Sequence, residues 1–92
     1  MKTYIGDVPD IQLDIGRDVS AASALVIEAL KPDGTTIVTW SAELLGTTEI
    51  RYVVPAGTLD QPGDWYLQAK VTIDGRTWYG ESARLKVYER FK

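Results

Sequence analysis

The chain has 92 residues, a formal net charge of −3 at pH 7, 45% hydrophobic residues, and neither cysteine nor histidine. This length fits one domain spanning residues 1–92, and scattered basic residues on an acidic chain exclude a nucleic-acid surface built on phosphate contacts. Without imidazole or thiol groups, Ser-His-Asp and Cys-His catalysis and the usual zinc sites are also excluded. No apolar run approaches the length of a membrane span, so we expect no membrane partner.

The first half of the chain shows the period-two alternation of short β-strands. Residues 3–6 form a short β-prone arm, and apolar residues alternate with polar ones over residues 11–15. In residues 25–30 the core-facing set is Leu25, Ile27 and Ala29, which leaves Val26 and Leu30 facing outward. A short helical turn is plausible only at residues 20–24.

Two further strands follow a turn at Lys31-Pro-Asp-Gly-Thr35. Proline presets φ at its first central position and glycine supplies the permissive one, so the segment predicts a tight hairpin turn. Residues 37–44 then alternate, with Trp40 on the core face and Ile37 on the other. Residues 50–54 alternate in the same way, with Val53 outward.

The C-terminal part predicts a long hairpin. From Trp65 to Ile73 the odd positions are apolar, and Asp74-Gly75 supplies the positive φ values of a type I′ turn. Pairing across this turn places Trp78, at an even position, on the core face, whereas the later apolar residues Leu85 and Val87 occupy odd positions. One strand satisfies both only with an extra residue, so we expect a β-bulge within residues 80–83, with Gly80 in an unusual backbone conformation.

These elements predict an all-β protein, an antiparallel β-sandwich of about seven strands. Turn signals recur every eight to twelve residues or so, as they do in that architecture. We expect Trp40, Trp65 and Trp78 to meet in one interior, as core side chains rather than as a ligand platform. The outer surface is then left for binding.

Three pairs of aspartates flank turns and are candidates for carboxylate chemistry or calcium binding: Asp7 and Asp10, Asp14 and Asp18, and Asp60 and Asp64. A glycosidase pair needs a cleft between its carboxylates, and the spacing matches no EF-hand loop. The simpler interpretation is that aspartates at turns accept hydrogen bonds from their own backbone. We therefore expect no enzyme, no cofactor and no metal.

The candidate partner-binding residues lie on the outward parity: Tyr66, Tyr79, Tyr88, Val26 and Leu30. Aromatic side chains interleaved with polar ones suit a protein partner or a sugar ring. The alternative is ordinary cross-strand packing on a solvated face.

One stretch, Asp60-Gln-Pro-Gly63-Asp-Trp65-Tyr-Leu67, resembles the Asp-x-Gly-x-Tyr-x-Cys corner of immunoglobulin-like domains, with one inserted residue. Trp65 takes the tyrosine place and Leu67 the cysteine place, so an indole replaces the corner hydroxyl. The tight turn at residues 31–35 departs from that family, because it pairs neighbouring strands in one sheet. The resemblance implies an immunoglobulin-like sandwich.

A longer set of motifs resembles small structural proteins of tailed phages and prophages, in particular the N-terminal immunoglobulin-like domain of phage upper baseplate proteins. The motifs are Tyr4-Ile-Gly-Asp7-Val8, Leu13-Asp-Ile-Gly16, Lys31-Pro-Asp-Gly-Thr35, Gly57-Thr-Leu-Asp-Gln-Pro-Gly63, Trp65-Tyr-Leu-Gln-Ala69, Gly80-Glu81 and Val87-Tyr-Glu-Arg-Phe-Lys92. Their order and spacing together carry the likeness.

This resemblance implies a non-enzymatic virion protein, made in the host cytoplasm, that acts as a baseplate or tail component or a head decoration. It would dock on other virion proteins or on further copies of itself, with residues 3–6 available for strand addition. The alternative function is a carbohydrate-binding module that attaches to a host surface glycan through the same tyrosines. The resemblance leaves the place in the virion, the partner and the oligomeric state open.

Overall fold

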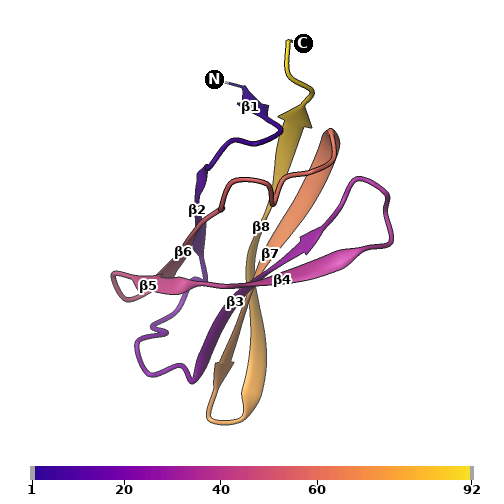
Figure 1. Ribbon diagram of the computed structural model, residues 1–92. Coiled ribbons are helices and arrows are strands. Elements are labelled where there is room, and N and C mark those ends of the chain that lie inside the picture. Colours follow the sequence, from indigo (N-terminus) through magenta and orange to yellow (C-terminus); the bar gives the residue numbers. More distant parts are fainter. Residues whose placement is uncertain (1, 92) are drawn as a thin grey trace.

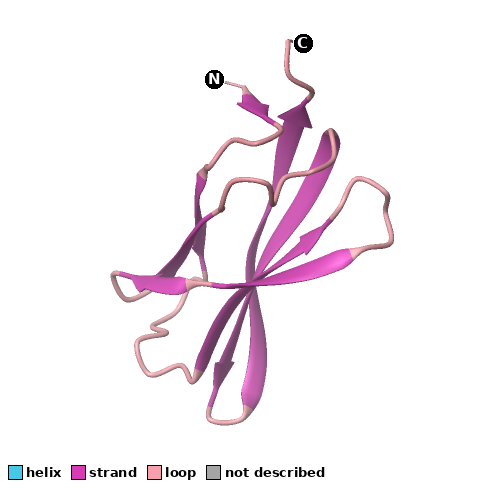
Figure 2. Cartoon of the chain, viewed as in Figure 1, coloured by secondary structure: helices cyan, strands magenta, loops and turns pink. Residues whose placement is uncertain are grey.

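The computed structural model describes residues 2–91, which form eight β-strands in two layers (Figure 1). No helix occurs in that part of the chain (Figure 2), and so none that could span a membrane. The strands are β1 (Thr3–Tyr4), β2 (Asp10–Asp14), β3 (Ala24–Leu30), β4 (Ile37–Ser41), β5 (Glu43–Leu45), β6 (Glu49–Val53), β7 (Gly63–Ile73) and β8 (Arg76–Tyr88). The five-stranded sheet has the order β1-β8-β7-β3-β4 and the three-stranded sheet the order β2-β6-β5. The predicted all-β sandwich is confirmed.

The β7–β8 hairpin is the longest feature of the fold, and it follows the predicted register. Asp74 and Gly75 have φ values of 52° and 76°, as a type I′ turn requires. The register shifts once: Gln68 lies opposite Ser82, whereas Lys70 lies opposite Tyr79. Two residues of β8 therefore oppose one of β7, and the predicted bulge is confirmed.

The reason for a glycine in this bulge differs from the prediction. Gly80 does not have a positive φ, so the expectation of an unusual backbone angle was wrong. A Cβ on Gly80 would instead lie 2.8 Å from Ile15 Cδ1 and 3.0 Å from the carbonyl oxygen of Asp14. Glycine is needed here because β8 passes directly over the end of β2.

The core lies between the two sheets and is centred on two of the three tryptophans. Trp40 stacks on Trp65 with ring centroids 6.3 Å apart, and on Tyr52 of the smaller sheet at 5.1 Å. Trp78 packs against the edge of this core but is only half-buried, and Arg17 covers its ring at 3.8 Å. The expectation of one interior for all three rings therefore holds for Trp40 and Trp65, while Trp78 caps the core.

Strand β3 confirms the predicted alternation, with Ile27 and Ala29 fully buried. The β3–β4 hairpin joins neighbouring strands of one sheet, as the tight turn predicted. The segment before β3 contains a single turn, closed by the Ala22 N–H donating to the Val19 carbonyl at 3.0 Å, in place of the helical turn considered for residues 20–24.

The N-terminal arm is already paired within the chain. β1 runs parallel to the end of β8, with Thr3 opposite Val87 and Tyr4 opposite Tyr88 (Figure 1). The Ile5 N–H extends this pairing to the Tyr88 carbonyl at 2.9 Å. The expectation that residues 3–6 are free for strand addition was therefore wrong for the described residues.

Candidate functional site

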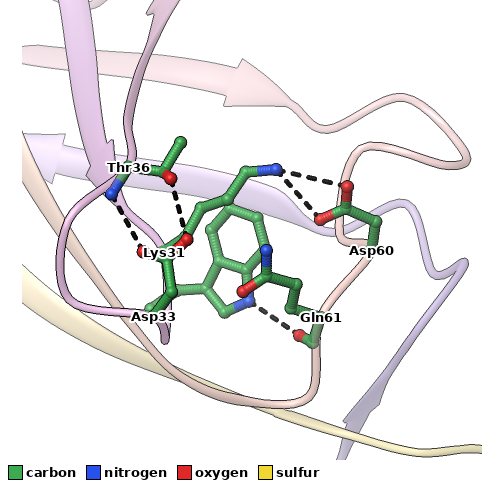
Figure 3. A network of polar contacts seen from close by, with 6 residues as sticks. Lys31, Asp33, Thr36, Asp60 and Gln61 are labelled. Atoms are coloured by element: carbon green, nitrogen blue, oxygen red, sulfur yellow. Dashed lines mark hydrogen bonds and ion pairs between the residues drawn. The ribbon is translucent and has the colours of Figure 1, made fainter.

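A polar corner fixes the end of the large sheet where β4 begins (Figure 3). The indole N–H of Trp65 donates to the Gln61 carbonyl at 3.0 Å. In immunoglobulin-like domains a tyrosine hydroxyl at the corresponding corner makes a similar hydrogen bond to the backbone a few residues upstream. Lys31 crosses the Trp65 ring at 5.6 Å and pairs with Asp60 at 3.1 Å. These contacts tie the β3–β4 hairpin to the loop before β7.

The turn that enters β4 is ordered by one carboxylate. Asp33 accepts hydrogen bonds from the backbone N–H groups of Thr35 and Thr36, both at 2.9 Å, and from the Thr36 hydroxyl at 2.7 Å. The bond from the Thr36 N–H is the largest cause that lowers the pKa of Asp33, to about 2. Because these donors favour the ionised form, the turn is most ordered when Asp33 is charged.

We expect the carboxyl resonance of Asp33 to titrate with a pKa of about 2 in a carbon-detected NMR experiment. A folded-state pKa below the unfolded value adds stability that is fully present above the ordinary carboxyl pKa. That stability is lost as the pH falls through about 2. Asp33→Asn should flatten this part of the stability profile, and a pKa at the ordinary value of 3.8 would contradict the turn geometry.

The outward face of the large sheet carries an apolar row across three neighbouring strands. Ile37 on β4 lies opposite Leu30 on β3, and Leu30 lies opposite Tyr66 on β7. The side chains of Ile37 and Tyr66 are 61% and 51% exposed. Large apolar groups this exposed, adjacent and on one face mark a binding surface more than singly scattered ones do.

A shallow hollow of about 230 Å³ lies against this row, and we call it the sheet hollow. Its lining residues are Glu28, Leu30, Ile37, Tyr66, Leu67, Gln68 and Ser82. Glu28, Gln68 and Ser82 form the next row across the sheet and supply the polar side of the hollow. An apolar floor with a few polar groups at its margin is the usual composition of a ligand-accepting surface.

The structure divides the five predicted partner-binding residues. Tyr66 and Leu30 meet in the sheet hollow. Val26 lies outside the hollow, beyond the row of Glu28 and Gln68, and is half-buried opposite Lys70. Tyr79 is 59% exposed on β8, also opposite Lys70. Tyr88 lies apart at the β1 end, where its ring is 6.0 Å from that of Tyr4.

Sequence reasoning placed Ile37 and Gln68 outward but did not select them, and it missed Glu28 and Ser82 as lining residues. The pairing of β3 with both β4 and β7 brings these positions together. The residues that this pairing makes neighbours are far apart along the chain, so their contact is not visible in the local sequence pattern. The outward parity of Ile37 next to that of Leu30 was the one signal available.

A second hollow, of about 500 Å³, lies beside the turn of the β7–β8 hairpin. It is lined by Arg17, Asp18, Ile73, Asp74, Arg76 and Trp78. The guanidinium of Arg17 already covers one face of the Trp78 ring. Two cationic and two anionic side chains balance here, so this hollow selects no charge of ligand.

Three of the six turn aspartates accept local hydrogen bonds, whereas Asp10 and Asp60 form ion pairs with Arg51 and Lys31. Asp7, Asp14 and Asp18 each accept one from a backbone N–H two or three residues away in the chain. For Asp18, the hydroxyl of Ser20 is the first cause that lowers its pKa, followed by the Ser20 backbone N–H. Within residues 2–91, no three acidic side chains gather as ligands for a metal ion.

The fold defines an all-β sandwich, and one solved structure resembles it along almost the whole chain. CopC from Methylosinus trichosporium OB3b matches with a TM-score of 0.62 and 19% sequence identity, covering 99% of this chain and 87% of its own. No protein-family model matches the sequence, and a search of the curated proteins finds no match. At this identity, the likeness establishes the fold and leaves function to the residues.

The comparison corrects the phage interpretation. The structural neighbour is CopC, not a phage structural protein, and nothing found connects this chain to a phage. The assignments as a phage or prophage virion protein, as a baseplate, tail or capsid-decoration component, and to the virion as a location were therefore wrong. The glycan-attachment alternative falls with the host-attachment role on which it depended. The motifs behind that resemblance are largely turn residues, which a β-sandwich needs whatever it does.

The chain also lacks the side chains of a usual transition-metal site. Copper sites in proteins are built mainly from imidazole, thiolate and thioether ligands. The sequence has no histidine and no cysteine, and its single methionine, Met1, lies outside the described residues.

Proposed function

We propose that this chain is a non-enzymatic protein-binding module that docks a partner protein on the sheet hollow. The observation that carries the proposal is the exposed apolar row of Ile37, Leu30 and Tyr66, continuous across three paired strands. Tyrosine contributes a large, amphipathic contact area at low cost in side-chain entropy, which suits a protein interface.

The polar margin of the hollow supports binding more than turnover. Glu28 is the single carboxylate of its described lining, so the paired acid and base of a hydrolase are lacking there. Within the described residues, the Gln68 amide nitrogen donates to the Gly80 carbonyl at 3.4 Å, and the amide oxygen can accept a hydrogen bond from a partner. An apolar centre with a hydrogen-bonding rim is the usual anatomy of a protein–protein interface.

Photo-crosslinking tests this proposal directly. A photoreactive amino acid at Gln68, inside the hollow, should give one discrete adduct in cells of the native host. The same group at Thr77, on the same face but near the hairpin tip, should give none. Once the partner is purified, Ile37→Ser with Tyr66→Ser should weaken its binding at least about tenfold, because each residue loses a buried apolar contact.

The control for this pair is Val53→Ser with Tyr79→Ser, which removes two side chains of 44% and 59% exposure outside the hollow. These variants should bind as the parent does. Binding unaffected by the Ile37 and Tyr66 changes, or lost equally in the control, would place the interface elsewhere. Turnover of a substrate that depends on Glu28 would contradict the non-enzymatic assignment.

A further inference from the structure

Strand β4 has an unpaired edge whose hydrogen-bonding groups can be assigned from its pairing with β3. The Ala42 N–H donates to the Leu25 carbonyl, and the Lys31 N–H donates to the Thr36 carbonyl. In an antiparallel pair, hydrogen-bonded and non-hydrogen-bonded residue pairs alternate. Val38 and Trp40 therefore bond to β3, and the alternate residues of β4 direct their N–H and C=O groups to the free edge.

These free-edge residues are Ile37, Thr39 and Ser41, and all three side chains are exposed. β4 forms the margin of the five-stranded sheet, with β3 as its only neighbour among the described strands. Each backbone group there is positioned to join a further strand.

The other outer strands of the described chain carry features that discourage such pairing. β2 bears an aspartate at each end, and its Asp14 N–H is already held by the Glu81 carboxylate at 3.2 Å. β5 bears Glu43, and β1 is only two residues long. β4 has five residues, Ile-Val-Thr-Trp-Ser, with no charge, no proline and no bulge. Natural proteins protect solvent-exposed edges with those features, so an edge without them is suited to pairing.

We propose that β4 pairs antiparallel with β4 of a second copy of this chain, about a two-fold axis through Thr39. Only odd-numbered residues face the edge, so Thr39 pairs with its own copy, and Ile37 pairs with Ser41 of the second copy in both directions. Each hydrogen-bonded pair exchanges two bonds, giving about six across the interface. The same patch then serves both subunits, as an isologous interface requires.

The side chains fit this register. An uncharged strand approaches its own copy without like-charge repulsion, and directly opposed threonines are a favourable cross-strand pair. Just beyond β4, the same register sets Glu43 against Thr35 of the second copy, so no two carboxylates oppose each other. A second copy of this strand is therefore a complementary occupant.

The dimer is expected to be reversible, because five residues a side bury less than the roughly 800 Å² per partner of a typical stable interface. It would join the two five-stranded sheets into one continuous sheet. Ile37 lies both on this edge and in the sheet hollow, so the two hollows would lie on one face. Such a dimer presents two equivalent surfaces to a multivalent partner. The pairing itself stands independently of the proposed docking function.

Proline at position 39 tests the pairing without disturbing β3. The Thr39 N–H faces the free edge, so Thr39→Pro removes an edge donor and spares the β3–β4 ladder. Sedimentation over a concentration series should show a monomer–dimer equilibrium for the parent protein and dimerisation at least about tenfold weaker for Thr39→Pro. The matched control is Gln12→Pro, at an edge-facing position of β2, which should dimerise as the parent does.

Charge at the axis tests the register. Thr39→Lys and Thr39→Glu should each be monomeric, because like charges would oppose each other across the axis. An equimolar mixture of the two should recover a dimer. With no native cysteine, Thr39→Cys should also form a disulfide-linked dimer in air, while the control Thr77→Cys should not.

A parent protein that remains monomeric throughout the concentration series would overturn the proposal. So would a dimer insensitive to Thr39→Pro, or a lysine and glutamate mixture that stays monomeric. Far-UV circular dichroism of each variant distinguishes loss of pairing from loss of fold. The partner-binding test above also changes Ile37, which lies on this edge. Tyr66→Ser alone, on a strand two positions from the edge, should weaken partner binding and leave dimerisation unchanged, so failure of one proposal is distinguishable from failure of the other.

Discussion

Trp65→Ala is expected to lower the free energy of unfolding by about 3–5 kcal/mol, measured by urea denaturation at neutral pH. The side chain is fully buried and stacks on Trp40. Its removal leaves a cavity between the sheets and deprives the Gln61 carbonyl of its donor. A loss of that size is a large fraction of the stability of a small domain.

Two phenylalanine variants separate packing from hydrogen bonding. Trp65→Phe keeps a ring in the core but loses the indole N–H, so it should cost less than alanine and still about 1–3 kcal/mol. Trp78→Phe is the matched control, because that ring is only half-buried at the margin of the core. Equal losses for the two phenylalanine variants would contradict the central role of Trp65.

The strands were predictable from the sequence because their determinants are local. Alternation identified the buried face of β7. The parity conflict between Trp78 and Val87 predicted a bulge within residues 80–83, and the structure places it opposite Ala69. The exposure of Trp78 was not predictable in the same way. Parity assigns a face of the sheet, whereas burial also requires a second layer above that face. Trp78 lies at the margin of the core, where Arg17 covers one face of its ring.

The candidate site was predicted only in part, for a related reason. Outward parity correctly placed Leu30 and Tyr66 on one face. It could not show that Ile37 completes the row, because that neighbourhood depends on the order β7-β3-β4 in the sheet. Tyr88 shared the outward parity but lies next to Tyr4, since strand β1 pairs at that end.

The phage resemblance failed because its motifs consist largely of turn chemistry. Segments such as Lys31-Pro-Asp-Gly-Thr35 report where a chain reverses direction, and many unrelated β-sandwiches need the same residues there. CopC shares the architecture at 19% identity. At that identity the likeness shows the fold alone. Function therefore has to be argued from the surface of the large sheet, whose residues are particular to this chain.

Gly80→Ala is the second change expected to have a large effect, with a loss of about 1–3 kcal/mol in the free energy of unfolding. The new methyl group would lie 2.8 Å from Ile15 Cδ1 and 3.0 Å from both the Asp14 carbonyl oxygen and Ile15 Cα. A flexible side chain can move away, but the two backbone atoms cannot, since β2 is held in place by its pairing with β6. The strain therefore falls on the contact between the two sheets.

A double-mutant cycle identifies this cause. Ile15→Val removes the Cδ1 atom, so the loss from Gly80→Ala should be smaller in the Ile15→Val background by roughly 0.5 kcal/mol or more. Part of the loss should remain, because the backbone contacts of Asp14 and Ile15 are unchanged. If the two changes were simply additive, the side-chain contact would not be the origin of the strain. A loss of only a few tenths of a kcal/mol for Gly80→Ala would mean that β8 does not pass this close to β2.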